Sequence, residues 1–280
     1  TYRAFEVIVV DNKSADNSLD IARTHALAPA IIEAGSNLGF AAANNLAAAR
    51  ASGEWLAMLN PDAYARADWL QRLVEASERH PHADAFGSTQ LNAANPAMLD
   101  GAGDCFHIFG VAYRGGYGQP AAHAPAEGEC FAPCAAAALY RKSAFRALGG
   151  FDERFFCYNE DVDLGYRLRL AGGAAVQAPL AVVLHEGSGV TGRHSEFTIY
   201  HGHRNRLWTH YKNTPALLFA IGFPGHVLLN MYLFVRFCFA GGARAYARAM
   251  RDAILGAGAF RQDRRRLAAQ RRARVRDIAR

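Results

Sequence analysis

The sequence predicts an α/β domain with a doubly wound, mostly parallel sheet. Short apolar runs rich in β-branched residues alternate with stretches of helical length in the N-terminal part of the chain, as is typical of such domains. Acidic or histidine residues follow the carboxyl ends of three apolar runs, where ligands bind in such sheets. The 280 residues, 51% hydrophobic and 20% charged, suffice for one large globular domain with an appendage.

The expected strands and helices follow from apolar periodicity and from the residues that begin and end each element. The strands are expected at residues 6–10, 30–33, 55–59, 135–140 and 182–184, and the helices at 14–25, 41–51, 69–79 and 161–170. Ser14 or Asp16 is expected to cap the first helix. Gly53 ends the second helix, and Pro81 stops the third. The glycine-rich stretch from Gly110 to Gly118 predicts a flexible loop.

The C-terminal part differs in character from the α/β domain, which is expected to occupy residues 1–212. Leu217 to Phe239 is strongly apolar, and its length approaches the ~20 residues that span a bilayer. Pro224, His226 and Asn230 interrupt this segment. An interfacial or re-entrant helix pair and a buried helical hairpin therefore stand as alternatives to a membrane span.

The positive charge is concentrated at the C-terminus, in the tail of the expected appendage at residues 213–280. Residues 241–280 carry 12 Arg, no Lys and 3 Asp, a net charge of +9, whereas the rest of the chain carries −3. An apolar segment next to an arginine cluster predicts binding to an anionic membrane surface. We expect this partner rather than nucleic acid.

The cysteines and the N-terminal residues predict a cytoplasmic location at the inner face of the cell membrane. Five cysteines stand at positions 105, 130, 134, 157 and 238 without a Cys-x-x-Cys pair, so neither a disulfide framework nor a zinc ribbon is expected. Free cysteines suit a reducing compartment. The apolar run from Val7 to Val10 is shorter than the roughly 7–15 residues of a signal-peptide core.

Two adjacent carboxylates, Glu160 and Asp161, begin a predicted helix directly after an aromatic loop. Carboxylates in such a place are candidates for a general base. The alternative is structural, because acidic residues in the first turn of a helix complement its dipole. Asp163 and Arg167, four residues apart on this helix, are expected to pair on its surface.

Asp11, Asp62 and His185 each follow a predicted strand. Asp62 can coordinate Mg²⁺ or Mn²⁺ bound to a diphosphate, and His185 can complete the metal shell. Asp11 can accept hydrogen bonds from a base or ribose. The structural alternatives are turn formation for both aspartates and a packed, hydrogen-bonded histidine.

Three further residues lie on a turn that leads into a predicted helix: Asn37, Gly39 and Asn45. The N-terminus of a helix suits a phosphate group, because its free amides point outward and its dipole favours negative charge. The turn is therefore a candidate for phosphate binding.

Taken in order, these motifs resemble those of family 2 glycosyltransferases, most closely their rhamnosyltransferase-like branch. The resemblance covers residues 5 to about 212. It rests on Val9-Val10-Asp11-Asn12-Lys13-Ser14-Ala15-Asp16, Asn37-Leu38-Gly39-Phe40 with Asn44-Asn45, Leu59-Asn60-Pro61-Asp62-Ala63, Gly150-Phe151-Asp152-Glu153 with Phe155-Phe156, Glu160-Asp161-Val162-Asp163-Leu164 with Arg167, and His185.

The resemblance implies a GT-A fold and an inverting, metal-dependent transfer from a nucleotide-diphosphate sugar. Asp11 would read the nucleotide base. Asp62 would be the last acid of the metal-binding Asp-x-Asp motif, whose first position is Asn60 here, and His185 would add a third metal contact. Asp161 would be the general base, with Glu160 as its rival. One base suffices for a single in-line attack, while the metal carries the charge of the leaving diphosphate.

The resemblance also implies further residues that contact the substrate. In addition to Asp11, they are Asn37, Gly39, Asn45, Phe151, Asp152, Phe156 and Arg167. The donor is expected to be a dTDP- or UDP-sugar, with rhamnose ahead of galactofuranose, glucose and N-acetylhexosamine. The acceptor is expected to be a lipid-linked or cell-surface glycan.

One departure from the family pattern concerns the N-terminus. Family members place a strand and a helix ahead of the Val-Val-Asp-Asn strand, and this first βα unit is expected to be missing from residues 1–280. An inactive, membrane-bound scaffold is therefore the alternative function. A nucleotidyltransferase on a related fold is a third hypothesis, which the sequence does not support because it has no Gly-rich basic loop near its start.

Overall fold

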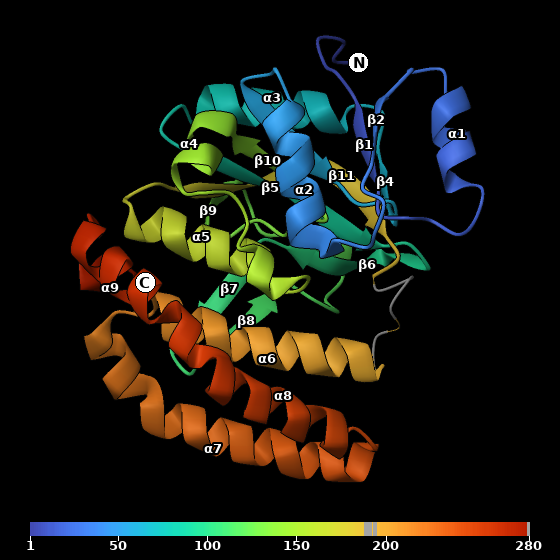
Figure 1. Cartoon of the computed structure of the whole chain (residues 1–280). Helices are drawn as coiled ribbons and strands as arrows, with labels where there is room; N and C mark the ends of the chain where they lie inside the picture. Colours follow the sequence, from blue (N-terminus) through green and yellow to red (C-terminus); the bar gives the residue numbers. More distant parts are fainter. Residues whose placement is uncertain (188–191, 193–194, 279–280) are drawn as a thin grey trace.

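The computed structural model describes residues 1–187, 192 and 195–278. Its centre is a seven-stranded sheet with helices on both faces, and further helices extend below it in Figure 1. The main path of the sheet runs β3 (Trp55–Leu59), β10 (Ala137–Arg141), β5 (Ala85–Asn92), β11 (Ala175–His185) and β4 (Ala63–Ala65). Two more strands pair at its sides, β6 (Asn95–Ala102) with β5 and β9 (Gly128–Cys130) with β11.

The expectation of a mostly parallel sheet is wrong, because the sheet is mixed. Within the seven strands only β5 and β11 pair in parallel, and the other ladders are antiparallel. β6 follows β5 after Ala93 and Ala94 alone, a connection that makes a hairpin and is too short for a parallel crossover. β1 (Ile8–Asp11) and β2 (Ala30–Glu33) pair in parallel as a separate two-stranded sheet.

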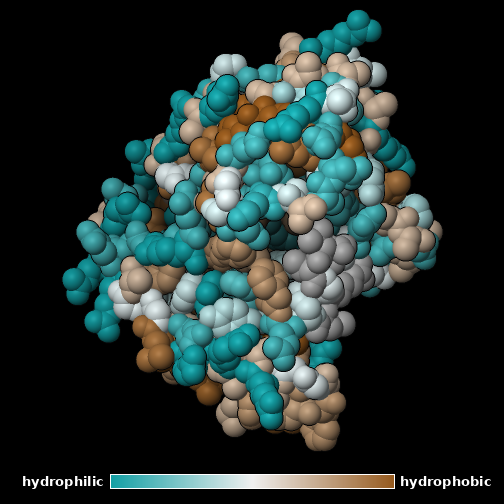
Figure 2. Space-filling model, turned by 45° about the vertical axis from the view of Figure 1, so that its right-hand side comes forward, coloured by the Kyte–Doolittle hydropathy of each residue, from teal (hydrophilic) through white to brown (hydrophobic). Residues whose placement is uncertain are grey.

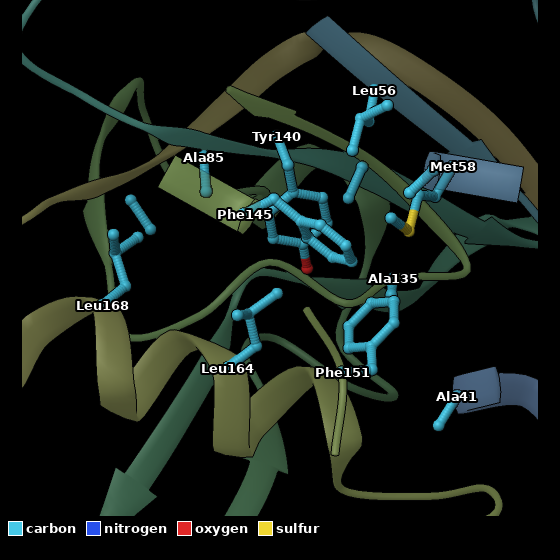
Figure 3. Packing of buried hydrophobic residues seen from close by; sticks show 13 residues of the cluster. Ala41, Leu56, Met58, Ala85, Ala135, Tyr140, Phe145, Phe151, Leu164 and Leu168 are labelled. Carbon is cyan, nitrogen blue, oxygen red and sulfur yellow. The ribbon is translucent and has the colours of Figure 1, made fainter. Parts of the chain in front are cut away.

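One face of the main sheet is covered by α2 (Gly39–Arg50), α4 (Lys142–Ala147) and α5 (Glu160–Leu170). Ala138 and Tyr140 of β10 point to this face, where Tyr140 packs among Phe145, Phe151 and Leu164 (Figure 3). Alternate residues of a strand face opposite sides, so neighbouring β10 residues serve the opposite core. This first core fixes the start of α5 against the sheet.

The other face is covered by α3 (Trp69–Arg79). Ala137 and Leu139 of β10 point into this second core, together with Phe86 of β5 and Leu73 of α3. The Trp69 indole nitrogen donates to the Ser88 hydroxyl at 2.8 Å, which satisfies the polar atom of a buried ring.

Most elements match the sequence-based expectation in type. The strands at 30–33 and 55–59 and the helix at 69–79 have the predicted bounds. The first helix is shorter, since α1 spans Ser18–Thr24 with Asn17 as its N-cap rather than Ser14 or Asp16. The expectation of a flexible loop over Gly110–Gly118 is wrong in its first half. Here β8 (Val111–Arg114) pairs antiparallel with β7 (Asp104–His107).

The C-terminal elements pack below α5 and the hairpin of β7 and β8 (Figure 1). They are α6 (Glu196–Asn213), α7 (Ala216–Ala240), α8 (Ala243–Gly256), α9 (Arg261–Gln270) and α10 (Val275–Ile278). The apolar segment forms a single helix that runs through Pro224. The chain turns back after Gly241, which adopts φ +84°, so α7 and α8 form an antiparallel pair. Short 3-10 helices complete the chain at Ala121–His123, Glu153–Phe155 and Ala257–Phe260.

Candidate active site

Asp62 and His185 meet at one end of the sheet. His185 is the last residue of β11, and Asp62 lies in the turn between β3 and β4, which pairs with β11. The His185 Nε2 atom lies 3.5 Å from Asp62 Oδ1, and the Nδ1 atom lies 2.7 Å from Asp100 Oδ2. The amide of Glu186 donates to the carbonyl of Asp62 at 3.0 Å. The sequence therefore placed Asp62 and His185 correctly at one edge, but gave no role to Asp100.

This arrangement fits a divalent cation. The bond to Asp100 engages Nδ1 and leaves Nε2 facing Asp62, which is how an outer carboxylate orients a metal-binding histidine. A carboxylate oxygen and an imidazole nitrogen are acceptable Mn²⁺ ligands, and carboxylates also suit Mg²⁺. Burial lowers the pKa of His185, but the hydrogen bonds to Asp100 and Asp62 outweigh it and raise the pKa overall. A proton thus competes with a cation for Nε2.

Asp161 lies in the first turn of α5, partly exposed. Its Oδ2 accepts a hydrogen bond from the amide of Ala135 at 3.0 Å, and its Oδ1 accepts one from the amide of Val162 at 2.8 Å. Burial raises the pKa of Asp161, while the two amides and the nearby Arg114 lower it in part. The carboxylate is thus held rigidly, with a proton affinity above that of an ordinary aspartate. These are the properties of a general base.

Glu160 is placed differently from its neighbour. Only 5% of its surface is exposed, and its Oε2 atom has no hydrogen-bond partner among the described residues. Burial and the charge of Asp161 raise the pKa of Glu160 well above its ordinary value. A buried acid does not reach an acceptor hydroxyl, so the geometry favours Asp161 for this role.

Asp104 and Cys134 lie next to Asp161, and the ligand atoms of the three side chains lie within 4.8 Å of one another. Burial and the Asp161 charge raise the pKa of Asp104 to about 8. Burial raises the pKa of Cys134 to about 12, so this thiol stays protonated. Because Mg²⁺ and Mn²⁺ prefer oxygen ligands and a thiol binds metals as thiolate, we do not assign the cation to this group.

Arg114 links the two parts of the site. Its guanidinium forms an ion pair with Asp100, the partner of His185. Burial alone would lower the pKa of Arg114, but Cys134 and the acids Asp100, Asp104 and Asp161 raise it overall. The positive charge of Arg114 therefore reaches both the Asp62–His185 edge and Asp161.

A cavity of about 1010 Å³ borders Asp104 on the side of the β7–β8 hairpin. Its wall includes aromatic side chains of three elements, Phe106 of β7, Phe131 after β9 and Tyr166 of α5. These rings pack on each other with centroid distances between 5.1 and 5.2 Å. Asp62, Asp161 and His185 do not line this cavity, so it is not the candidate active site itself.

The loop in front of α5 has an unusual backbone. Phe156, Tyr158 and Asn159 have φ angles of 67°, 69° and 67°, in the left-handed region that non-glycine residues rarely adopt. Asn205 of α6 holds this loop, with its Nδ2 atom 2.9 Å from the carbonyl of Phe155, 2.7 Å from that of Cys157 and 2.8 Å from that of Tyr158. Such backbone strain occurs where the surrounding structure over-determines a functional loop.

Gly39 packs directly under this loop. A Cβ atom at Gly39 would lie 2.5 Å from the ring of Phe156, and the φ angle of Gly39 is +78°, so a side chain there would clash. The amide of Ala41 donates to the carbonyl of Phe156 at 3.1 Å. Asn37 accepts a hydrogen bond from the amide of Gly39 at 3.0 Å. The turn of Asn37 and Gly39 therefore meets the aromatic loop before α5.

Asn45 and Phe151, two further predicted substrate-binding residues, engage each other. The Asn45 Oδ1 atom accepts from the amide of Phe151 at 2.9 Å, and its Nδ2 atom donates to the Phe151 carbonyl at 2.8 Å. The Phe151 ring is buried in the core shown in Figure 3. Both side chains thus fix the loop, and their contact with substrate stays a prediction.

Asp152 and Arg167 belong to a buried ionic group centred on Asp163. Arg167 donates to Asp163 Oδ2 at 2.8 Å, and Lys212 lies 2.9 Å from the same carboxylate and 2.7 Å from Asp152 Oδ2. Asn213 adds a bond to Asp163 Oδ1 at 2.7 Å. The expectation that Asp163 and Arg167 pair is confirmed, but the pair is buried rather than on the surface. A role of Asp152 and Arg167 in substrate binding stays a prediction.

Asp11 ends β1, away from the main sheet. Its two carboxylate oxygens accept from the amide of Ser14 at 3.1 and 3.3 Å, the bond of a turn-forming aspartate. This bond to Ser14 lowers the pKa of Asp11. The residue is ionised and partly exposed, and its contact with a nucleotide base stays a prediction.

The residues that the sequence did not single out are Asp100, Asp104, Arg114 and Asn205. Each acts on a residue that the sequence did identify, or on the loop in front of it. A histidine that ends a strand needs an outer partner for Nδ1, but nothing in the sequence indicates which acid supplies it.

The chain matches a family model described as Glycosyl transferase family 2 over residues 1–149. An N-acetylglucosaminyl-diphospho-decaprenol L-rhamnosyltransferase of Mycobacterium tuberculosis (strain ATCC 25618 / H37Rv) is 30% identical over 247 residues, or 78% of this chain and 76% of that protein. An O-antigen biosynthesis protein RfbC of Myxococcus xanthus is 30% identical over 195 residues, which are 67% of this chain and 15% of that protein.

Two solved structures are similar in fold. The mannosyltransferase PcManGT from Pyrobaculum calidifontis, in complex with GDP-Man and Mn2+, has a TM-score of 0.51 at 17% identity over 98% of this chain and 75% of that chain. GalNAc-T7 with UDP, GalNAc and Mn2+ has a TM-score of 0.57 at 14% identity over 73% of this chain and 41% of that chain. At these identities the likeness shows the fold, which is GT-A-like with a mixed sheet and C-terminal helices.

Proposed function

Because the chain belongs to glycosyltransferase family 2, we propose that it is an inverting glycosyltransferase that uses a nucleotide-diphosphate sugar. The observation that carries this proposal is the separation of two chemical tasks. Asp62 and His185 face each other at the sheet edge, whereas Asp161 is held by two amides at the start of α5. The first pair suits a metal-bound diphosphate, and the second group suits an acceptor hydroxyl.

Asp62 and His185 would hold Mn²⁺ or Mg²⁺, and the cation would stabilise the charge of the departing diphosphate. Asp100 orients the imidazole through the Nδ1 bond of 2.7 Å. Arg114, paired with Asp100, adds a fixed positive charge near the site of charge development, which is an electrostatic contribution that requires no reorganisation.

Asp161 would take the proton of the acceptor hydroxyl as that oxygen attacks the anomeric carbon. The attack forms the new glycosidic bond, the bond to the diphosphate breaks, and the configuration inverts. Asp161 is partly exposed and Glu160 is buried, so only the former is open to an acceptor. The raised pKa of Asp161 brings its proton affinity closer to working pH, where a general base is most effective.

The donor and acceptor are proposed from the relatives. The mycobacterial relative is named as an L-rhamnosyltransferase that acts on N-acetylglucosaminyl-diphospho-decaprenol, and the Myxococcus relative is named for O-antigen biosynthesis. These names support rhamnose as the transferred sugar and a lipid-linked glycan as the acceptor. For the donor nucleotide we propose dTDP or UDP. A lipid-linked acceptor in turn supports a location at the cytoplasmic face of the cell membrane.

Donor binding by calorimetry tests the metal assignment. Asp62→Ala should abolish Mn²⁺-dependent binding of a dTDP- or UDP-sugar, because it removes one of the two facing ligands. Asp100→Asn should weaken metal affinity by about 10–100-fold, as outer-partner changes do. Asp20→Asn, an exposed change on α1, serves as the matched control. If Asp62→Ala binds donor as wild type does, with and without chelator, the assignment is wrong.

A further inference from the structure

One face of α7 is apolar and exposed along the whole helix. Its most exposed large side chains lie mostly three, four or seven residues apart, which places them on one stripe. They are Leu217 (60% exposed), Ile221 (61%), Leu228 (66%), Met231 (61%), Tyr232 (63%), Val235 (53%) and Phe239 (89%). Figure 1 shows α7 at the lower edge of the molecule, and Figure 2 shows brown and tan hydrophobic residues at that edge. By length and composition α7 could also cross a membrane.

The opposite face of α7 is shaped for close contact with the enzyme. A Cβ atom at Gly222 would lie 2.3 Å from the carbonyl oxygen of Ile108, and one at Gly225 would lie 2.3 Å from the ring of Phe109. Both contacts lie at the turn of the β7–β8 hairpin. Glycine is therefore required at these two positions for the helix to approach the hairpin.

Polar side chains of the same face complete the attachment. His226 Nδ1 bonds to the carbonyl of Phe109 at 2.8 Å. The Asn230 Oδ1 atom accepts from Arg206 of α6 at 2.5 Å and from the hydroxyl of Tyr246 of α8 at 2.8 Å. A polar side chain that has these partners is satisfied without water, so the middle of α7 is held against the catalytic domain.

This attachment decides between the orientations that the sequence left open. A span needs ~20 residues across the hydrocarbon layer, and α7 has 25 in all. Residues 222 to 230, in its middle, are fixed to the hairpin, α6 and α8. A membrane-crossing α7 would carry these elements into the hydrocarbon, whereas an α7 parallel to the membrane keeps every contact and presents its apolar stripe to lipid.

α8, which packs against α7, adds positive charge to this part of the molecule. Arg244, Arg248 and Arg251 are exposed and lie three to four residues apart on one side of the helix. The same helix ends with Ile254 and Leu255, which are 70% and 75% exposed. Arginines next to exposed apolar side chains match the phosphates and acyl boundary of an anionic bilayer. Arg251 pairs with Asp252 and Arg248 lies over the ring of Tyr200, but three arginines against one aspartate leave α8 with a net positive charge that a neutral partner surface would not balance.

We propose that α7 lies in the plane of an anionic membrane, with its stripe at the headgroup–acyl boundary and the α8 arginines on lipid phosphates. If the chain transfers a sugar as proposed above, this placement also bears on catalysis. Arg206, which holds α7 through Asn230, directly follows Asn205, which holds the loop in front of Asp161. One turn of α6 thus joins the membrane-bound helix to the loop that would meet a lipid-linked acceptor.

Vesicle co-sedimentation of the full chain tests the docking surface. The wild type should sediment with vesicles of phosphatidylglycerol and phosphatidylcholine, and less with phosphatidylcholine alone or at high salt. Leu228→Glu with Val235→Glu should weaken binding by about tenfold or more, because burial of two large side chains is lost. Ile21→Glu with Leu27→Glu, at exposed apolar residues of α1 and of the turn after it, is the matched control. If both double variants sediment with vesicles as much as the wild type does, the proposal is wrong.

Depth measurements separate the in-plane from the spanning orientation. In a Cys238→Ser background, an environment-sensitive fluorophore is attached through Ile221→Cys, Leu228→Cys or Val235→Cys, and quenched by lipids that carry quenchers at known depths. An in-plane helix gives one shallow depth for all three positions. A graded series, or a maximum at position 228, would show a span and overturn the proposal.

Two other results would also be decisive. The wild type could fail to bind vesicles and instead form a dimer that Leu228→Glu with Val235→Glu dissociates. The stripe would then be a self-association surface, and the proposal would be wrong. Vesicle binding is measured without donor or acceptor. Intact membrane binding with no sugar transfer would therefore contradict the proposed function and leave the docking proposal standing.

Discussion

Two clusters of carboxylates are built on the first turn of α5, and they are neutralised in opposite ways. The Asp163 cluster consists of Asp152, Asp163, Arg167, Lys212 and Asn213, and its acids contact cations. The Asp161 cluster consists of Asp104, Cys134, Glu160 and Asp161, and its acids face each other or backbone amides. The two central aspartates are only two residues apart on one helix.

The pKa directions reflect this difference. Burial alone would raise the pKa of Asp163, but Lys212 and Arg167 lower it overall. Burial raises the pKa of Asp161, and the amides and Arg114 offset only part of this rise. Helix α6 supplies Lys212 to the Asp163 side of α5, whereas Asp161 accepts hydrogen bonds from two backbone amides. A single helical turn therefore carries two aspartates with different properties. Asp163 is an ionised structural residue, and Asp161 is a candidate proton acceptor.

The largest effect is expected at Asp161. Asp161→Asn keeps the shape and removes the base, so turnover should fall by ~10²–10⁴-fold while donor affinity stays near that of wild type. Glu160→Gln should be the milder change, because the Glu160 side chain is buried and does not reach an acceptor. Transfer rate and donor affinity, measured for both variants in the intact protein, check this. If Glu160→Gln is inactive and Asp161→Asn turns over normally, the two roles are reversed.

Asp163 should instead affect stability. Asp163→Asn leaves Lys212 and Arg167 buried with one carboxylate fewer, and breaking a buried ionic group in this way costs about 3–5 kcal/mol. Denaturant unfolding measures the loss, and Asp20→Asn on the exposed surface of α1 should change stability by less than about 0.5 kcal/mol. If Asp163→Asn keeps full stability but loses activity, Asp163 takes part in catalysis and is not a structural residue.

The comparison also explains what the sequence can predict. The helix at 69–79 and the strand at 55–59 follow from local periodicity and from Pro81, so their bounds are correct. The adjacent acids at the start of α5 are equally local. Locally, only the spacing to Arg167 sets Asp163 apart from Asp161. The second cation, Lys212, comes from 49 residues further along the chain, and local patterns do not reveal it.

The mixed sheet and the outer site residues were missed for the same reason. β11 pairs with β4 and β5, which lie far back in the chain, and strand direction depends on such distant partners. Asp100 reaches His185 across 85 residues, and Asn205 reaches the loop across 47 to 50. Only the folded chain brings these side chains together, so no pattern in the sequence marks them.

The smallest effect is expected at Asp104. A substitution there tests the Asp161 cluster through the pH dependence of the free energy of unfolding rather than through activity. Burial and the Asp161 charge raise the pKa of Asp104 from its ordinary value of 3.8 to about 8. The folded protein therefore keeps a proton that the unfolded chain releases above pH 3.8. The contribution of this group to stability is complete below pH 3.8, declines as the pH rises, and is lost above about pH 8.

Asp104→Asn should remove this dependence, because an amide does not titrate. Between pH 6 and 8 the wild type should lose about 2 kcal/mol more stability than the variant, just below the limit that one proton sets, which is roughly 1.4 kcal/mol per pH unit. Denaturant unfolding of both proteins at the two pH values measures the difference. If the variant is destabilised equally at pH 6 and pH 8, Asp104 is ionised and bound to Arg114, and the Asp161 cluster would then be neutralised by a cation as the Asp163 cluster is.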